Sequence, residues 1–123
     1  MSDTDTDTGS AFAVRRAVES MAIIAIRGEL TGASEDGLTE AWTRDADPLT
    51  RRIVLDFSRL EYMNSTGIGL LVTMLVRAQR NRQELVAFGL SDHYREILSL
   101  TRLDEAIAVV GSEDEATAGS RLT

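Results

Sequence analysis

Four short apolar runs that contain β-branched residues alternate along this chain with segments whose apolar residues recur at helical spacing. The runs cover residues 21–26, 52–56, 84–88 and 106–110. Short runs of this kind favour buried strands, whereas apolar residues at i, i+3 and i+4 favour helices. Because alternating strands and helices need crossover connections, the pattern predicts an α/β fold with a mixed, mostly parallel sheet of four to five strands and helices mainly on one face.

The first half of the chain is expected to begin with a hairpin. Residues 12–18 form its edge strand, Glu19-Ser20 its turn and residues 21–26 its buried strand. A helix then covers residues 32–45, with Ser34 as its N-cap and Asp47-Pro48 as its end. Strand 52–56 follows, and residues 57–63 are expected to form a loop or short turn.

The second half repeats helix and strand. A long helix is predicted from Asn64 to about Asn81, and a second helix runs from a Ser91 cap to about Leu100. Strands 84–88 and 106–110 come after these helices. Ser112 and Glu115 have the spacing of a capping box, which indicates a short last helix.

The length and charge of the chain indicate one domain. We expect it to cover residues 11–118 of the 123, between a disordered acidic tail at 1–10 and a flexible end at 119–123. The net charge of −7 divides into −3 in residues 1–10, −2 in residues 11–110 and −2 in residues 111–123, and a nearly neutral body does not favour nucleic acid as a partner. No stretch is apolar enough for a membrane span or a signal peptide, so a cytoplasmic protein is expected.

Composition also removes most catalytic machinery. The chain has no cysteine, a single histidine and no lysine, because all 13 basic residues are arginine. Thiolate chemistry, Schiff-base chemistry and a Walker-type phosphate loop are therefore excluded. We assign no catalytic residue, no metal site and no cofactor, and we expect the protein not to be an enzyme.

The most informative segment is residues 54–71, where strand 52–56 ends at Asp56 and small polar residues later precede the long helix. Asn64 or Ser65 can accept hydrogen bonds from the first free amides of that helix. The helix start also carries partial positive charge, so a hydroxyl there is well placed for phosphorylation. The same residues also fit a plain helix cap, and the two roles are compatible.

The long helix is expected to present a mixed apolar and arginine surface, which is typical of a protein interface. At about 100° per residue, its buried stripe would consist of Ile68, Leu71, Val72 and Leu75. The opposite face would carry Thr66, Leu70, Thr73, Arg77 and Arg80, with Met74 at its edge. Scattered exposed apolar residues are also normal on protein surfaces.

The chain resembles the STAS domain family, which is named for sulfate transporters and anti-sigma factor antagonists. The resemblance rests on Leu55-Asp56 followed by Asn64-Ser65-Thr66-Gly67-Ile68-Gly69, on Gly28-Glu29-Leu30 and on Leu100-Thr101-Arg102-Leu103. It spans about residues 12–118. Asn64 stands where the family motif usually has Asp, and Thr66 stands where it has Ser.

The resemblance to the antagonist branch implies a function as an anti-sigma factor antagonist. The partner would be an anti-sigma factor that is also an ATP-dependent serine-protein kinase, and its phosphorylation of Thr66 (alternatively Ser65) would switch the antagonist off. A phosphatase would reset the cycle, and the protein would be a monomer or a weak dimer. The residues expected to bind the partner are Asn64, Ser65, Thr66, Gly67, Leu70, Thr73, Met74, Arg77 and Arg27.

Several alternatives stay open. The domain could instead be a scaffold subunit of a signalling assembly, or an accessory subunit of a lipid or anion transporter. Arg27 is a candidate for contact with a partner's nucleotide or with the motif. His93 is expected to be a surface residue and Trp42 a core residue, whereas Asp56 is expected to hydrogen-bond the loop that follows it.

Overall fold

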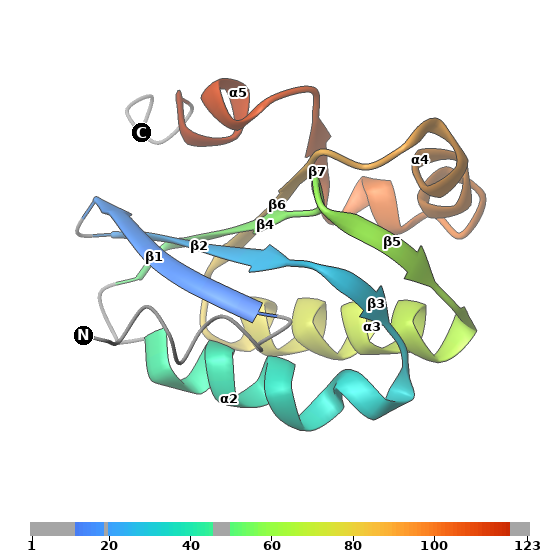
Figure 1. The fold of residues 1–123 in the computed structure, drawn as a ribbon. Coiled ribbons are helices and arrows are strands. Elements are labelled where there is room, and N and C mark those ends of the chain that lie inside the picture. Colours follow the sequence, from blue (N-terminus) through green and yellow to red (C-terminus); the bar gives the residue numbers. More distant parts are fainter. Residues whose placement is uncertain (1–11, 19, 46–49, 119–123) are drawn as a thin grey trace.

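The computed structural model describes residues 12–18, 20–45 and 50–118 and has one central sheet (Figure 1). Its strand order is β1-β2-β4-β6-β7. Only β1 runs antiparallel to its neighbour, and Val18 pairs with Met21 as the predicted hairpin requires. The strands are β1 (Phe12–Val18), β2 (Met21–Ile26), β4 (Arg52–Asp56), β6 (Glu84–Phe88) and β7 (Ala108–Val110).

Helical crossovers join the parallel strands, as the alternation of strand and helix patterns predicts. The helical elements are η1 (Gly32–Ser34), α2 (Glu35–Asp45), α3 (Ser65–Arg80), α4 (Asp92–Leu100), η2 (Leu103–Glu105) and α5 (Glu113–Ala118). Figure 1 shows α2 and α3 together below the sheet and α5 above it. The predicted α/β fold with a mostly parallel five-stranded sheet is therefore confirmed.

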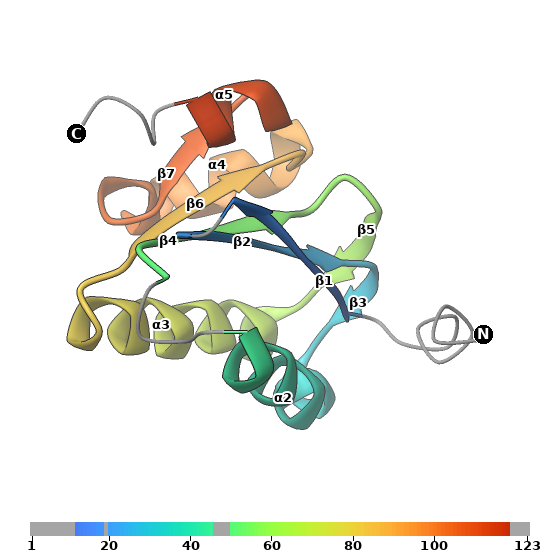
Figure 2. The ribbon, with the colours of Figure 1, turned by 90° about the vertical axis from the view of Figure 1, so that its left-hand side faces the viewer.

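The largest apolar core lies between the sheet and the helices α2 and α3, which Figure 2 shows under the same face. Ile24 and Leu55 reach it from the sheet, Trp42 from α2 and Leu71 from α3. A smaller core on the opposite face joins Met21, Ile23, Val54, Val86, Phe88 and Ala116 of α5. Each face of the sheet thus has its own apolar core, which explains why the central parallel strands are apolar on both faces.

A second sheet corrects the expectation for residues 57–63. Gly28–Leu30 forms β3 and Leu60–Met63 forms β5, and the two short strands pair in parallel. The Gly28 backbone has φ +76°, a left-handed conformation that turns the chain out of β2 into β3. The sequence expectation of a loop was wrong because β5 is short and its partner is distant in the chain.

Helix ends agree with the expectations except at one position. The predicted Ser91 cap is confirmed, since its hydroxyl accepts from the Tyr94 amide. Ser34, however, is not the N-cap, because Thr31 begins this turn and its hydroxyl accepts from the Ala33 amide at 3.2 Å. The expected tails, Asp47-Pro48 and Glu19 lie outside the described residues. Within the part of the chain that is described, no helix is long and apolar enough to cross a membrane.

Candidate functional site

Asn64 is the residue that begins α3. Its backbone is extended, and its side-chain Oδ1 accepts from the Gly67 amide at 2.9 Å. Of the two candidates for the cap, the structure thus selects Asn64, and Ser65 becomes the exposed first residue of the helix. This cap leaves the Thr66 side chain next to a helix start whose amides favour negative charge.

The Thr66 hydroxyl lies between the starts of two helical segments. It donates to Asn64 Oδ1 at 2.7 Å and accepts from the Gly32 amide, the first of η1, at 2.8 Å. The residue is nevertheless exposed, so another protein can reach it. The Thr66 hydroxyl is therefore held in one orientation at the protein surface.

Two glycines allow this close packing. A Cβ on Gly67 would collide with the backbone carbonyl of Leu30 at the end of β3. A Cβ on Gly32 would lie 3.3 Å from Thr66 Oγ1. Gly67 is buried, so its predicted role in binding a partner is corrected to packing the first turn of α3 against β3.

The orientation of α3 also corrects the predicted partner face. The buried residues are Gly67, Leu70, Leu71, Met74, Leu75 and Ala78. The expectation that Leu70 and Met74 face solvent is therefore wrong, and Val72 and Val76 are exposed instead, at 41% and 43%. Because almost every position from Ile68 to Val76 is apolar, periodicity alone does not fix the rotation of the helix.

The exposed face of α3 keeps its mixed character after this correction. A surface hollow is lined, among the described residues, by Val72, Thr73, Val76, Arg77, Arg80 and Asn81. Thr66 and Ser65 lie at the N-terminal end of the same helix. Apolar side chains beside arginines still form a surface of the composition found in protein interfaces.

Arg27 lies apart from the motif. It lines a different surface pocket, together with Ala13, Ala25, Asp56, Ser58 and Arg59, and it makes no hydrogen bond to residues 64–67. Asp56 holds the loop after β4, because its Oδ1 accepts from the Ser58 amide at 2.9 Å and the Ser58 hydroxyl at 2.6 Å. That prediction for Asp56 is confirmed.

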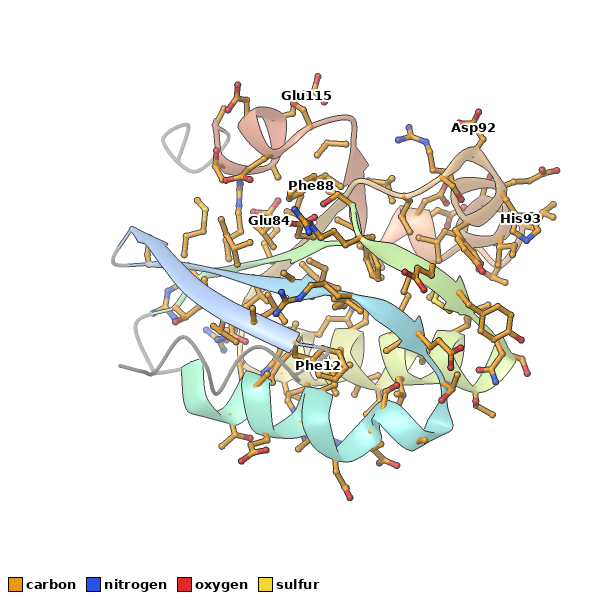
Figure 3. All side chains as sticks on the ribbon, viewed as in Figure 1. Phe12, Glu84, Phe88, Asp92, His93 and Glu115 are labelled. Atoms are coloured by element: carbon orange, nitrogen blue, oxygen red, sulfur yellow. The ribbon has the colours of Figure 1, made fainter. Side chains whose placement is uncertain are left out.

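The remaining candidates have structural places. Trp42 is buried in the core, as predicted, and His93 is exposed on the outer side of α4 (Figure 3). Among the residues that the structure describes, no three His, Cys, Asp or Glu side chains gather as a metal site would require.

Comparison with known proteins identifies the family of this domain. The model of the STAS domain family matches residues 13–116, which cover nearly all of the described chain. The chain belongs to the STAS domain family. The predicted resemblance to the STAS family is therefore confirmed.

Two bacterial relatives have similar sequences. BtrV of Bordetella bronchiseptica, whose name proposes an anti-sigma factor antagonist, is 27% identical over 82% of this chain and 87% of its own. The anti-sigma-B factor antagonist of Staphylococcus aureus is 31% identical over 70% of this chain and 80% of its own.

Solved structures share the fold of this STAS domain. The anti-sigma factor antagonist SpoIIAA matches in its unphosphorylated form (TM-score 0.65, 18% identity, 91% of this chain and 97% of that one). The phosphorylated form from Bacillus matches equally (TM-score 0.66, 21% identity, 90% and 100%). A sulfate transporter family protein from Wolinella succinogenes has TM-score 0.74 at 21% identity, over 88% and 90% of the two chains.

Two features of the site were missed by the sequence reasoning. The Gly32 amide bonds to Thr66 from 34 residues away, and no local pattern indicates such a contact. The Tyr94 hydroxyl accepts from the Met63 amide at 2.9 Å and ties α4 to the end of β5. The orientation of α3 did leave a signal, because the small residues Gly67 and Ala78 share one helical face with Leu71 and Met74.

Proposed function

We propose that this STAS domain is a cytoplasmic anti-sigma factor antagonist. Its partner is an anti-sigma factor that is also a serine-protein kinase, and phosphorylation at Thr66 releases the antagonist from it. The observation that carries the proposal is the exposed Thr66 hydroxyl at the start of α3, held by Asn64 and Gly32. The names of BtrV and of the Staphylococcus aureus relative support the same role.

The chemistry of phosphorylation follows from the two hydrogen bonds of Thr66. Oγ1 attacks the γ-phosphorus of ATP on the kinase, the bond to ADP breaks, and the hydroxyl proton must leave. Asn64 Oδ1 accepts a hydrogen bond from this hydroxyl, but a neutral amide is not a base at neutral pH. The kinase must therefore supply the group that takes the proton.

The phosphate would change the proposed binding surface in two ways. It adds a charge of about −1.5 to −2 at the head of α3. It also removes the proton that Thr66 donates to Asn64, and it needs room beside Gly32, whose backbone already approaches Oγ1. Within a packed contact, an unpaired charge of this size costs about 3–5 kcal/mol, enough to end binding.

The partner surface that we propose is the corrected exposed face of α3. It comprises Asn64, Ser65, Thr66, Val72, Thr73, Val76 and Arg77. The two valines replace Leu70 and Met74 as the apolar part of this surface. Arg77 and Arg80 add positive charge that an acidic partner surface would complement.

The test is binding of the candidate kinase to wild type, Thr66→Glu and a control, Ser99→Glu, which adds the same charge at an exposed position of α4. We expect Thr66→Glu to weaken binding at least about tenfold, by unpaired charge at the interface, and Ser99→Glu to bind as wild type does. Equal binding by Thr66→Glu and wild type would overturn the proposed switch.

A further inference from the structure

We propose that this STAS domain has a second binding site, a pocket that takes a small carboxylic acid bearing a hydroxyl or amino group. The pocket of about 300 Å³ lies where β2 and β4 end, on the surface of the sheet. Its lining among the described residues is Ala13, Ala25, Arg27, Asp56, Ser58 and Arg59. The proposal does not depend on the function assigned to Thr66.

Strand register explains why the surface is hollow there. Ala25 pairs with Ala13 of β1 on one side and with Asp56 of β4 on the other. Directly paired residues point to the same face of a sheet, so two methyl side chains form the floor beside the Asp56 carboxylate. Phe88 of β6 pairs with Asp56 on the other side and lies on the face of the sheet that α5 covers (Figure 3).

This pocket and the proposed kinase surface lie on opposite sides of the sheet. Ile24 and Ile26 point into the core under α2 and α3. Because side chains alternate along a strand, Ala25 between them points to the opposite face, where α5 lies. A ligand in this pocket and a partner on the exposed face of α3 therefore occupy different sides of the domain.

Arg27 gives the pocket its chemistry. Its Nε and Nη2 atoms are buried and have no hydrogen-bond partner, and the structure gives the guanidinium no ion pair to any described residue. An arginine is always charged and can only donate, so burying it without an acceptor is unfavourable. A half-buried arginine with two buried, unpaired nitrogens beside an open pocket indicates that a carboxylate or another oxyanion completes the arrangement.

Asp56 narrows the class of ligand. Its Oδ1 is occupied by Ser58, whereas Oδ2 has no partner among the described residues. A phosphate dianion near Arg27 would meet this carboxylate and be repelled. A carboxylate ligand with a neighbouring hydroxyl or ammonium group can instead pair with Arg27 and donate to Asp56. Exposed Arg59 adds a second positive charge at the rim.

The direct test is titration of the full chain with L-malate and L-glutamate, followed by the amide NMR shifts of residues 25–28 and 56–59. We expect at least one of the two acids to shift these amides, and to bind more tightly than succinate or inorganic phosphate. Arg27→Met should weaken that binding at least about tenfold through loss of a charged hydrogen bond, whereas exposed Arg95→Met on α4 should not. Absence of binding by both acids, tighter binding of phosphate, or unchanged affinity in Arg27→Met would overturn the proposal.

A measurement without ligand gives an independent check. Because Nε and Nη2 of Arg27 have no acceptor within the protein, replacing the guanidinium should not weaken the fold. The unfolding temperature of Arg27→Met should therefore equal or exceed that of Arg95→Met. A clearly lower value would mean that Arg27 serves the fold itself, and would also overturn the assignment of a ligand-binding role.

Discussion

Gly67 is the residue that determines how closely the first turn of α3 packs against β3. Its α-carbon lies against the Leu30 carbonyl, which brings the first turn of α3 to the end of β3 and Thr66 to the Gly32 amide. A side chain at position 67 would have to push two backbone segments apart. The absence of a side chain at position 67 is thus required by packing.

Gly67→Ala should lower the free energy of unfolding by about 1–3 kcal/mol, because the new methyl group overpacks a contact between backbones. The matched control is Gly69→Ala on the same helix, where a Cβ meets no atom within 4 Å. That variant should be more stable than wild type by up to about 1 kcal/mol, the difference in helix propensity. Urea denaturation of the two variants checks both signs, and equal effects would contradict the packing role.

Asn64 contributes through its side-chain oxygen, which serves both the Gly67 amide and the Thr66 hydroxyl. Asn64→Ala should cost about 1 kcal/mol of stability through loss of the cap. Asn64→Asp keeps the acceptor and adds charge at a helix start, so it should be at least as stable as wild type. Thermal unfolding of the two variants measures this order, and the reverse order would contradict the capping role.

Among the helices, α3 has a buried face and an exposed face, and substitutions on the two faces should affect different properties of the protein. Met74→Ala should destabilise the protein by about 2–5 kcal/mol, because Met74 is 1% exposed in the main core. Because Val76 faces solvent, Val76→Glu should change the free energy of unfolding by less than about 0.5 kcal/mol. It should nevertheless weaken binding to the kinase, because Val76 belongs to the proposed partner surface. Denaturation and binding assays of both variants check the orientation; a Val76→Glu variant that binds normally would remove Val76 from the interface.

The sequence predicted that α3 exists but not which way it faces. Its length, cap and end follow from Asn64, the helical apolar pattern and Asn81. Its rotation depends on the long-range contact of Gly67 with Leu30, because apolar residues occupy nearly all sides of its first half. Strand β5 was missed for the same reason: its four residues form a strand by pairing with β3, more than 30 positions earlier.

At the scale of the whole molecule, Arg52 links the central sheet to the last helix. Its Nη2 lies 2.8 Å from Glu84 Oε1 across neighbouring strands, and its Nη1 donates to the Ala116 carbonyl at 2.7 Å. Arg52→Gln should lower stability by about 1 kcal/mol and speed amide exchange in Glu113–Ala118. Glu84→Gln, which leaves the bond to Ala116 possible, should have a smaller effect on α5; hydrogen exchange of both variants decides.

The overall architecture was predictable because its signals are local. Apolar runs, caps and the motif at residues 64–69 indicated the α/β order and the family. The candidate site was only partly predictable, since Thr66, Ser65 and Asn64 are placed by a local helix start. Three features depend on tertiary contacts that no single segment encodes. They are the hydrogen bond from Gly32 to Thr66, the exposure of Val72 and Val76, and the pocket at Arg27.

The proposal that Thr66 is the phosphoacceptor can be tested by mass spectrometry after incubation of the protein with the candidate kinase and ATP. We expect one phosphate, on Thr66 in wild type and in Ser65→Ala, and none in Thr66→Val. Phosphate on Ser65 with Thr66 unmodified, or undiminished incorporation into Thr66→Val, would contradict it.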